Sequence, residues 1–198
     1  MKVLLLSGGI DSSAIAVWKK PDFALTIDYG QRAARGEIIA AEAIASKLGI
    51  SHEVIRVDLA EFGVGSLAGK APSEIASAPE WWPYRNQMLI TIAGMRYVPK
   101  GIKQILIGAV ATDVHADGKA SFIDAIDAVM RAQEGRVRVN APAISMTAEQ
   151  LLQRSRFPRE LLGLTFSCHV MEYACGRCRG CQKHSAVVEK FLKSHPSA

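Results

Sequence analysis

The 198-residue sequence has no long hydrophobic run. A membrane-spanning helix needs roughly 18 or more consecutive apolar residues, and no stretch approaches this length. The apolar beginning of the chain is interrupted at Ser7 by a polar residue and two glycines, so it is too short for the hydrophobic core of a signal peptide. These absences exclude a membrane-embedded class and predict a cytoplasmic protein.

The sequence also has only a small excess of charge of one sign, no internal repeat and little low-complexity sequence. Lysine and arginine together number 24 against 19 aspartates and glutamates, which gives a net charge of +5. Four cysteine thiolates on a divalent metal would lower this value by about two. The remaining excess suits ligands that carry phosphate, but it is too small to indicate direct nucleic-acid binding. The length suffices for one well-buried core.

What the sequence does contain is an alternation of short apolar runs and helical patterns. Apolar runs without a polar face predict strands buried on both sides, which is typical of a parallel sheet covered by helices in an α/β fold. Glycine, alanine, serine and proline dominate residues 61–83, which predicts a mobile loop or lid. The predicted strands span residues 3–6, 23–27, 54–57, 104–107 and 137–139, and the predicted helices span 14–18, 37–48, 85–97, 122–132, 147–154 and 182–193.

The hexapeptide of residues 7–12, Ser-Gly-Gly-Ile-Asp-Ser, lies between the first predicted strand and the first predicted helix. Backbone N–H groups without bulky side chains then converge at the positive end of a helix dipole, which predicts an anion site. The hydroxyls of Ser7 and Ser12 add hydrogen bonds, and Asp11 is suited to the Mg²⁺ that accompanies a polyphosphate.

Other phosphate-binding motifs do not match this loop. It lacks the Gly-Lys-Ser or Gly-Lys-Thr of a Walker loop, and it is not the Gly-x-Gly-x-x-Gly of dinucleotide-binding folds. The structural alternative is a glycine turn that merely joins a strand to a helix.

All four cysteines lie within fourteen residues, at Cys168, Cys175, Cys178 and Cys181. In a reducing cytoplasm this clustering predicts a metal site, because the two short spacings wrap the chain around one ion. Four thiolates leave no open coordination position, so we expect structural Zn²⁺. An iron–sulfur cluster is the main alternative.

The loop resembles the fingerprint of the ATP-pyrophosphatase superfamily. Residues 24–32, the Pro-Tyr-Arg-Asn segment at 83–86 and the cysteine segment at 167–181 resemble the 7-cyano-7-deazaguanine synthase family of the queuosine and archaeosine pathways, and the resemblance runs from residue 1 to about residue 193. It implies a Rossmann-like fold of the adenine nucleotide alpha hydrolase type. The implied units are an ATP-binding domain at 1–160 and a zinc-binding segment with a helix at 161–198.

The resemblance also implies an activity. ATP would be cleaved between its α and β phosphates to adenylate the carboxylate of 7-carboxy-7-deazaguanine. Ammonia would then give the amide, and a second ATP would give the nitrile with release of AMP and pyrophosphate. A homodimer is implied as well, with zinc on the four cysteines and ATP with Mg²⁺ in the loop.

The expected site extends beyond the loop. Arg85 carries a guanidinium fork suited to a phosphate or carboxylate, with a surface arginine at a helix start as the alternative. Asp28 is either a magnesium ligand or a turn cap. The expected catalytic residues are Ser7, Asp11, Ser12 and Arg85, and the expected nucleotide site comprises Leu6, Ser7, Gly8, Gly9, Ile10, Asp11, Ser12, Ser13, Asp28, Gln31, Arg32, Arg85, Asn86, Gly108 and Asp113.

Two departures from the family pattern bear on base recognition and on the ATP chemistry. Residues 113–119 are shorter than, and different from, the family's Ser-Gly-Tyr-Pro-Asp-Cys-Arg type segment, which leaves base recognition open. The family's lysine after its Ala-Pro-Leu strand end is missing near Ala148, with Lys119 or Arg138 as possible substitutes.

The alternative function is that of a diverged relative, of the kind found in anti-phage gene clusters. Such a relative would join an adenylated deazapurine carboxylate to another amine such as a protein N-terminus.

Two other classes compete with these ligases. A thiolase acting on tRNA needs a catalytic cysteine pair outside the metal cluster, and the sequence has no further cysteine. A non-catalytic zinc-binding interaction module is the remaining class, and the intact hexapeptide argues against it.

Overall fold

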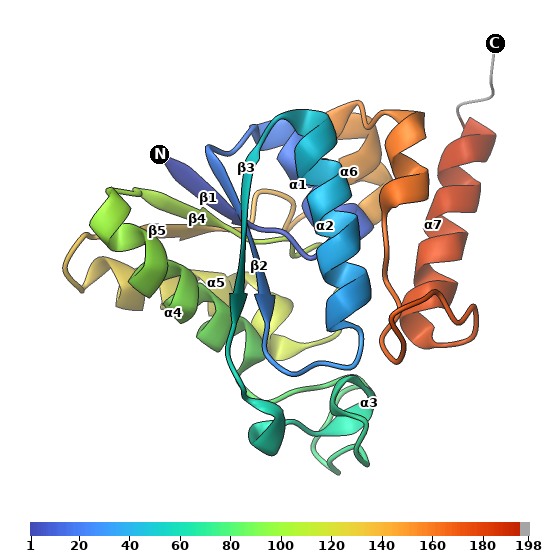
Figure 1. Cartoon of the computed structure of the whole chain (residues 1–198), viewed down its shortest axis with the longest axis horizontal. Helices are drawn as coiled ribbons and strands as arrows, with labels where there is room; N and C mark the ends of the chain where they lie inside the picture. Colours follow the sequence, from blue (N-terminus) through green and yellow to red (C-terminus); the bar gives the residue numbers. More distant parts are fainter. Residues whose placement is uncertain (195–198) are drawn as a thin grey trace.

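The computed structural model describes residues 1–194 and contains a five-stranded sheet in the order β3-β2-β1-β4-β5 (Figure 1). Every neighbouring pair is parallel, so Val3 on β1 lies opposite Phe23 on β2 and opposite Ile105 on β4. The predicted α/β class with a parallel sheet is confirmed. The strands are β1 (Lys2–Leu5), β2 (Phe23–Asp28), β3 (Ser51–Arg56), β4 (Gln104–Leu106) and β5 (Arg138–Asn140).

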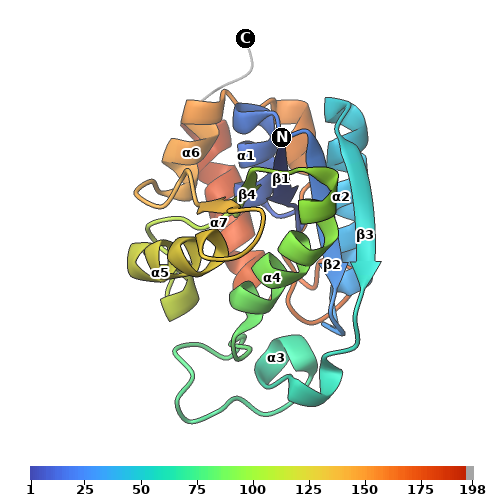
Figure 2. The same cartoon turned by 90° about the vertical axis from the view of Figure 1, so that its left-hand side faces the viewer.

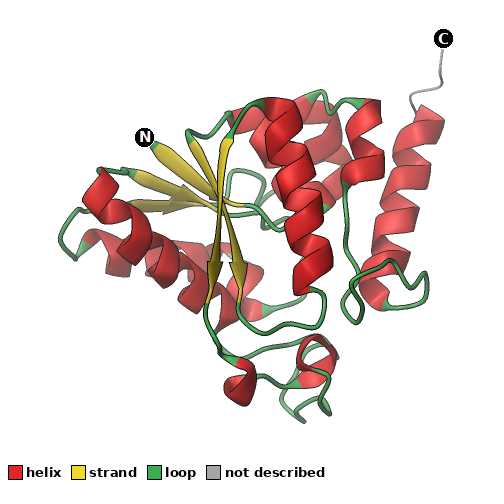
Figure 3. Cartoon of the chain, viewed as in Figure 1, coloured by secondary structure: helices red, strands yellow, loops and turns green. Residues whose placement is uncertain are grey.

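Helices cover both faces of the sheet (Figure 3). Because successive side chains of a strand point to opposite faces, Leu4 packs against the helices on one face of the sheet and Val3 against the helices on the other. Figure 2 shows α4 and α5 in front of the sheet and α1 and α7 behind it. One layer consists of α1 (Ile10–Lys19), α2 (Ala34–Leu48), α6 (Ala148–Ser155) and α7 (Arg179–Ser194), and the other of α4 (Arg85–Tyr97) and α5 (Ala120–Arg131).

The strand order determines where a ligand can enter. The chain runs from β1 outward to β2 and β3, then returns to place β4 on the other side of β1. At such a switch point the loops after two neighbouring strands part, and open α/β sheets bind ligands in the resulting crevice. The hexapeptide loop follows β1 and Gly108 follows β4, so both lie at this crevice.

Three predicted helix starts are wrong, and one of them is that of α2, which begins at Ala34 instead of residue 37. The first helix begins at Ile10 with Gly9 as its N-cap, so Asp11, Ser12 and Ser13 form its first turn instead of preceding it. The last helix begins at Arg179 instead of residue 182, because the turn between the cysteines is already helical. The N–H of Gln182 donates to the carbonyl of Cys178 at 3.0 Å, which is a helical hydrogen bond.

The predicted loop at 61–83 has more local structure than its composition indicates. It contains α3 (Gly65–Ala68) and is closed by a hydrogen bond from the N–H of Ser66 to the carbonyl of Pro79 at 2.8 Å. Trp82 is buried and meets the ring of Tyr29 edge-on at 4.9 Å. This closure depends on contacts between distant residues, which hydrophobic periodicity does not report.

The remaining predicted elements agree within two residues, apart from β3, which begins at Ser51 instead of residue 54. Helix α4 has the predicted bounds, α2 ends at Gly49 as predicted, and Thr147 forms a capping box with Gln150 at the start of α6. Val187 and Phe191 of α7 pack in the same core as Leu151 of α6. The division at residue 160 stays a prediction, and residues 195–198 of the expected second unit lie outside the described residues. Within residues 1–194, no helix is long and apolar enough to cross a membrane.

Candidate active site

The loop after β1 is pressed tightly against α2. Gly8 has a positive φ of 74°, and a Cβ added there would lie 2.5 Å from the Cβ of Ala40 and 2.8 Å from the backbone nitrogen of Ala41. Only glycine satisfies both the left-handed conformation and this close approach. Gly8 therefore lies outside the cavity lining and acts on the site by fixing the path of the loop.

The two predicted loop hydroxyls are brought together. The Oγ atoms of Ser7 and Ser12 lie 3.3 Å apart, and the backbone N–H of Ser7 donates to Ser12 Oγ at 3.3 Å. The N–H of Gly9 donates weakly to Ser7 Oγ at 3.4 Å. The hydroxyls and the first N–H groups of α1 thus surround one point at a helix N-terminus, an arrangement suited to an anion.

Asp11 lies in the first turn of α1 with one carboxylate oxygen engaged and one free. Its Oδ2 lies 3.7 Å from Nζ of Lys183, whereas its Oδ1 is buried with no hydrogen-bond partner among the described residues. Burial raises the pKa of Asp11 to about 6, while the nearby Lys183 pulls it down. A buried carboxylate oxygen without a partner fits the oxygen ligand that Mg²⁺ prefers, so this residue fits the predicted metal.

A cavity of about 360 Å³ opens over the loop, within the range of small-molecule sites. Its walls come from the ends of β1, β2 and β4, the start of α4, the 112–118 segment and the cysteine segment. Ten predicted residues line it: Leu6, Ser7, Gly9, Ile10, Asp11, Ser12, Arg85, Asn86, Gly108 and Asp113. Five do not: Gly8, Ser13, Asp28, Gln31 and Arg32.

The residues outside the cavity have structural contacts of their own. Asp28 accepts from the N–H of Gly30 at 3.2 Å and pairs with Arg56 at 3.8 Å, which are the contacts of its turn-cap alternative. Buried Gln31 donates to the carbonyl of Ile27 at 3.2 Å and so holds the end of β2. Arg32 is exposed. Ser13 is fully buried, and its hydroxyl has no partner among the described residues.

Gly108 allows the loop after β4 to approach the loop of residues 7–12, called the phosphate loop after the ligand that the sequence predicts for it. A Cβ at this position would lie 3.1 Å from the backbone nitrogen of Ser12 and 3.3 Å from its Cα. A larger side chain would therefore push against the first turn of α1. The absence of a side chain keeps the two loops of the switch point in contact and leaves the cavity open above them.

Arg85 lines the cavity, where acidic side chains and a tyrosine hydroxyl surround its guanidinium. Its guanidinium lies in the electrostatic field of Tyr29, Asp117 and Glu37. Burial raises the pKa values of both Tyr29 and Glu37. Asn86 donates to the carbonyl of Asp117 at 3.1 Å, so α4 also fixes the segment opposite it. Arg85 therefore lines the cavity, and its part in binding stays a prediction.

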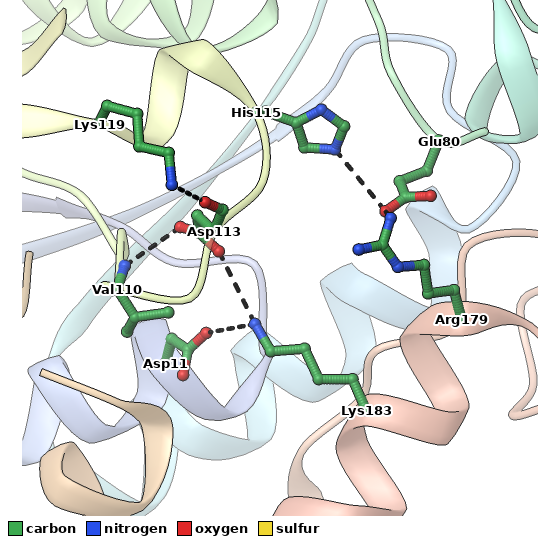
Figure 4. A network of polar contacts seen from close by, with 8 residues as sticks. All are labelled: Asp11, Glu80, Val110, Asp113, His115, Lys119, Arg179 and Lys183. Atoms are coloured by element: carbon green, nitrogen blue, oxygen red, sulfur yellow. Dashed lines mark hydrogen bonds and ion pairs between the residues drawn. The ribbon is translucent and has the colours of Figure 1, made fainter. Parts of the chain in front are cut away.

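Sequence reasoning missed a lysine in the cavity. Nζ of Lys183 lies 3.7 Å from Oδ2 of Asp11 and 3.7 Å from Oδ1 of Asp113, between the phosphate loop and the 112–118 segment (Figure 4). The other oxygen of Asp113 accepts from the N–H of Val110 at 3.1 Å. Lys183 belongs to no phosphate-binding motif, and its only signal in the sequence is its place two residues after Cys181.

A second missed group lies on the opposite wall. Nη1 of Arg179 donates to Oε1 of buried Glu80 at 3.2 Å, and Nε2 of His115 lies 3.7 Å from the same oxygen (Figure 4). His115 Nδ1 is also 3.0 Å from Ser77 Oγ. These contacts connect the 61–83 segment, the 112–118 segment and the cysteine segment, which are far apart in sequence.

The four cysteines form one compact cluster, as predicted. Their sulfur atoms all lie within 4.8 Å of one another, with Cys175 and Cys181 at 3.9 Å and Cys168 and Cys178 at 3.9 Å. The backbone N–H of Cys178 donates to Cys175 Sγ at 3.3 Å, and such backbone N–H groups lower the pKa of Cys175 to about 6. The segment therefore forms a metal site with thiolate ligands.

The size of the cluster fits a single tetrahedral ion. A metal–sulfur distance of about 2.3 Å gives a tetrahedron with edges of about 3.8 Å, close to the two pairs at 3.9 Å. A four-iron cluster needs more room between the same four sulfur atoms. Of the two flanking histidines, His169 contacts the cluster through its backbone N–H, which donates to Cys178 Sγ at 3.4 Å. His184 lies 2.8 Å from Thr165 Oγ1 through its Nε2.

Comparison with solved structures supports the fold. The U34-tRNA thiolase NcsA from Methanococcus maripaludis with its [4Fe-4S] cluster matches with a TM-score of 0.54 and 18% identity, over 99% of this chain and 67% of that one. NMN synthetase from Francisella tularensis matches with a TM-score of 0.50 and 14% identity, over 100% and 78%. At these identities the likeness shows the shared fold alone, and it agrees with the predicted adenine nucleotide alpha hydrolase type.

Sequence comparison identifies the family. The 7-cyano-7-deazaguanine synthase of Azotobacter vinelandii is 32% identical over 93% of this chain and 91% of its own length. The corresponding enzyme of Ralstonia pickettii is 31% identical over 94% and 93%, and 7-cyano-7-deazaguanine synthase 1 of Desulfitobacterium hafniense is 29% identical over 94% and 90%. Residues 1–192 match the family described as Queuosine biosynthesis protein QueC. The chain belongs to the QueC family.

Proposed function

We propose that this protein is an ATP-dependent carbon–nitrogen ligase that converts 7-carboxy-7-deazaguanine to 7-cyano-7-deazaguanine. The observation that carries the proposal is the juxtaposition, in one cavity, of residues of the Ser7 to Ser12 loop with Arg85. Asp11 also lines this cavity, and its buried Oδ1 has no hydrogen-bond partner among the described residues. The relatives that cover nearly the whole chain bear the name of this synthase.

We assign a part in this reaction to five of the predicted residues that line the cavity. The N–H groups and hydroxyls around Ser7, Gly9 and Ser12 bind the departing pyrophosphate, where they spread its charge. Asp11 holds the Mg²⁺ that neutralises the phosphates. Arg85 faces the cavity from the start of α4 and binds the substrate carboxylate bidentately.

The proposed reaction proceeds by two adenylations. A carboxylate oxygen of the substrate attacks the α phosphorus of ATP, and the bond to the bridging oxygen of pyrophosphate breaks. Ammonia attacks the activated carbonyl carbon, a proton leaves the nitrogen, and AMP departs with the carboxylate oxygen. The amide oxygen then attacks a second ATP in the same way. Loss of the remaining two N–H protons and departure of AMP with the amide oxygen leave the nitrile. No side-chain nucleophile is required.

The four cysteines are assigned to structural Zn²⁺, because four thiolates close the coordination shell and leave no position for substrate. The metal fixes the chain segment that carries Arg179 and Lys183 to the cavity wall. We further propose a homodimer in the cytoplasm, and the mass of the protein in solution, measured by light scattering, tests the dimer.

The activity is tested by incubating the purified protein with ATP, Mg²⁺, ammonium and 7-carboxy-7-deazaguanine and weighing the products by mass spectrometry. We expect the nitrile, with two AMP and two pyrophosphate per turnover. Ser12→Ala should reduce AMP formation by about 100-fold or more, since it removes a donor aimed at developing charge. Ser46→Ala, an exposed serine on α2, is the control. Absence of AMP from every candidate acid with the wild-type protein would reject the proposal.

A second candidate keeps the first adenylation and changes the amine. The 112–118 segment differs from the family pattern, and in this chain it is tied to Glu80 through His115. A wall with different contacts can admit a different acceptor, such as a protein N-terminus. In the same assay with a peptide or protein amine instead of ammonium, a covalent adduct of the deazapurine acyl group would support this candidate, and nitrile formation with ammonium alone would support the first.

A further inference from the structure

The cavity is lined by a lysine, Lys183, that does not belong to the phosphate loop. Among the described lining residues, three carry a fixed positive charge: Arg85, Arg179 and Lys183. Arg85 lies at the Tyr29 wall, and Arg179 is bound to Glu80. Lys183 alone of the three faces the carboxylate of the phosphate loop, with Nζ 3.7 Å from Asp11 Oδ2.

The two substitutes expected for the missing lysine lie elsewhere. Lys119 donates through its Nζ to the backbone carbonyl of Asp113 and does not line the cavity. Arg138 lies on β5, where its Nε donates to Oδ1 of Asp127 at 3.3 Å, also outside the cavity. At the position of the missing lysine, buried Ala148 contributes to the lining without a charge.

We propose that Lys183 is the phosphate-binding cation of this ATP site. It reaches the loop from α7, which packs beside α6, the helix whose start would carry the missing lysine. The inference rests on the proposed use of ATP and extends it by naming a residue that no motif of the loop contains.

The surroundings of Lys183 explain how it can serve a nucleotide. Its side chain is 46% exposed, so its ammonium group is accessible from the cavity. It is held between Asp11 and Asp113 by two contacts at 3.7 Å, longer than strong ion pairs with direct hydrogen bonds. Mg²⁺ held by the unpartnered Oδ1 of Asp11 would offset the negative charge that attracts Lys183 to this carboxylate. The ammonium, on a flexible four-carbon stem, would then be free to turn to the phosphate oxygens.

The position of Lys183 depends on the cysteine cluster. Cys181 lies in the first turn of α7, two residues before Lys183, and is buried. A metal on the four cysteines therefore fixes the start of the helix that presents the lysine. The cysteine cluster therefore affects phosphate binding through the position of Lys183. A metal coordinated by four thiolates has no open coordination position and takes no direct part in the reaction.

The test compares nucleotide affinities of zinc-loaded Lys183→Ala and wild-type protein. The ligands are α,β-methylene-ATP, which cannot be cleaved between its α and β phosphates, and adenosine, each titrated calorimetrically with Mg²⁺ present. We expect the affinity for α,β-methylene-ATP to fall about tenfold, the loss typical of one charged hydrogen bond, with adenosine affinity unchanged. Lys183→Arg should recover most of the loss. Lys193→Ala is the matched control, because Lys193 also pairs with a carboxylate on α7, that of Glu189, nearly three turns later.

Two outcomes would overturn the inference. One is unchanged affinity of Lys183→Ala for α,β-methylene-ATP, and the other is an equal loss for adenosine, which would indicate a general disturbance of the site. Metal content of one zinc per chain in each variant verifies that the cysteine cluster is intact. Because the titration needs no carboxylate substrate, phosphate binding by Lys183 can hold when no acid is adenylated, and it can fail when the ligase is active. The two proposals are therefore tested separately.

Discussion

Arg179 and Glu80 join two distant parts of the chain across the candidate active site. Nη1 of Arg179, just after the third cysteine, donates at 3.2 Å to Oε1 of Glu80, at the end of the segment that contains α3 (Figure 4). Glu80 is buried, whereas the Arg179 side chain is 49% exposed. The pair therefore connects the cysteine segment to a segment that otherwise has few regular backbone hydrogen bonds.

Breaking this pair should loosen the 63–83 segment. Arg179→Met keeps much of the side-chain volume but leaves the buried Glu80 carboxylate without its cation, so we expect faster amide hydrogen exchange across 63–83. The global unfolding free energy should change by less than about 1 kcal/mol, because the arginine is half exposed. Arg177→Met, a neighbouring exposed arginine, is the control. Exchange rates in 63–83 equal to those of the wild type would contradict this role.

Removing the metal site should affect both the stability and the cavity. Cys178→Ser removes one of four thiolates, and we expect loss of bound zinc and a drop in unfolding free energy on the order of 4 kcal/mol, as is typical when a structural metal is lost. Metal analysis of the wild type should give one zinc per chain without acid-labile sulfide. Iron with sulfide would instead support the cluster alternative. Nucleotide affinity should fall with metal content, since Arg179 and Lys183 lose their fixed positions.

Asp11 should make the unliganded protein less stable at higher pH. Its folded pKa of about 6 lies above the unfolded value of about 3.9, so the folded state binds its proton more tightly and loses stability as pH rises from about 4 to 6. Asp11→Asn should therefore raise the unfolding free energy at pH 8 by on the order of 1–3 kcal/mol, while abolishing AMP formation. The gain should shrink as pH is lowered to 5.5 in urea denaturation.

The control for this prediction is Asp124→Asn on the exposed side of α5. It should leave the pH dependence of the wild type unchanged. The pair with Lys183, which Asp11→Asn also removes, contributes little because the lysine is 46% exposed. An Asp11→Asn variant less stable than the wild type at pH 8 would show that the carboxylate is favourably ionised in the absence of ligand.

Gly8 and Gly49 provide a matched pair of substitutions. Both have positive φ, 74° and 65°, so alanine at either position costs roughly 1–2 kcal/mol in backbone strain. At Gly49 nothing lies within 4 Å of an added Cβ, whereas at Gly8 the Cβ would meet Ala40 at 2.5 Å. Overpacking adds about 1–3 kcal/mol at Gly8. We expect Gly8→Ala to lower the unfolding free energy by at least about 1 kcal/mol more than Gly49→Ala, measured by urea denaturation. Equal losses would mean that α2 can move away from the loop.

Local sequence accounts for most of the fold. The strands were predictable because runs such as that of β1 are apolar on both faces, and α4 was predictable because it begins after Pro83 and carries helical periodicity. The first turn of α1 was misplaced because Asp11 and Ser12 are typical N-cap residues, and here Gly9 takes that position. The N-cap preference of Asp11 and Ser12 did not determine the helix start, because Gly9 already has the extended N-cap conformation.

The site was predictable only in part. The phosphate loop and the four cysteines are short motifs in which spacing and residue type carry the chemistry, so the sequence alone indicated them. Lys183, Glu80, Arg179 and His115 have no such spacing, and their pairing arises only when the cysteine segment is folded against the cavity.

By itself, the sequence determined the parallel α/β architecture, the phosphate loop and the thiolate cluster, because each depends on residues adjacent along the chain. Only the tertiary structure decided which charges meet in the cavity. Ion pairs such as Lys183 with Asp11 form between residues far apart in sequence, and their energy depends on distance and burial, neither of which a linear pattern contains.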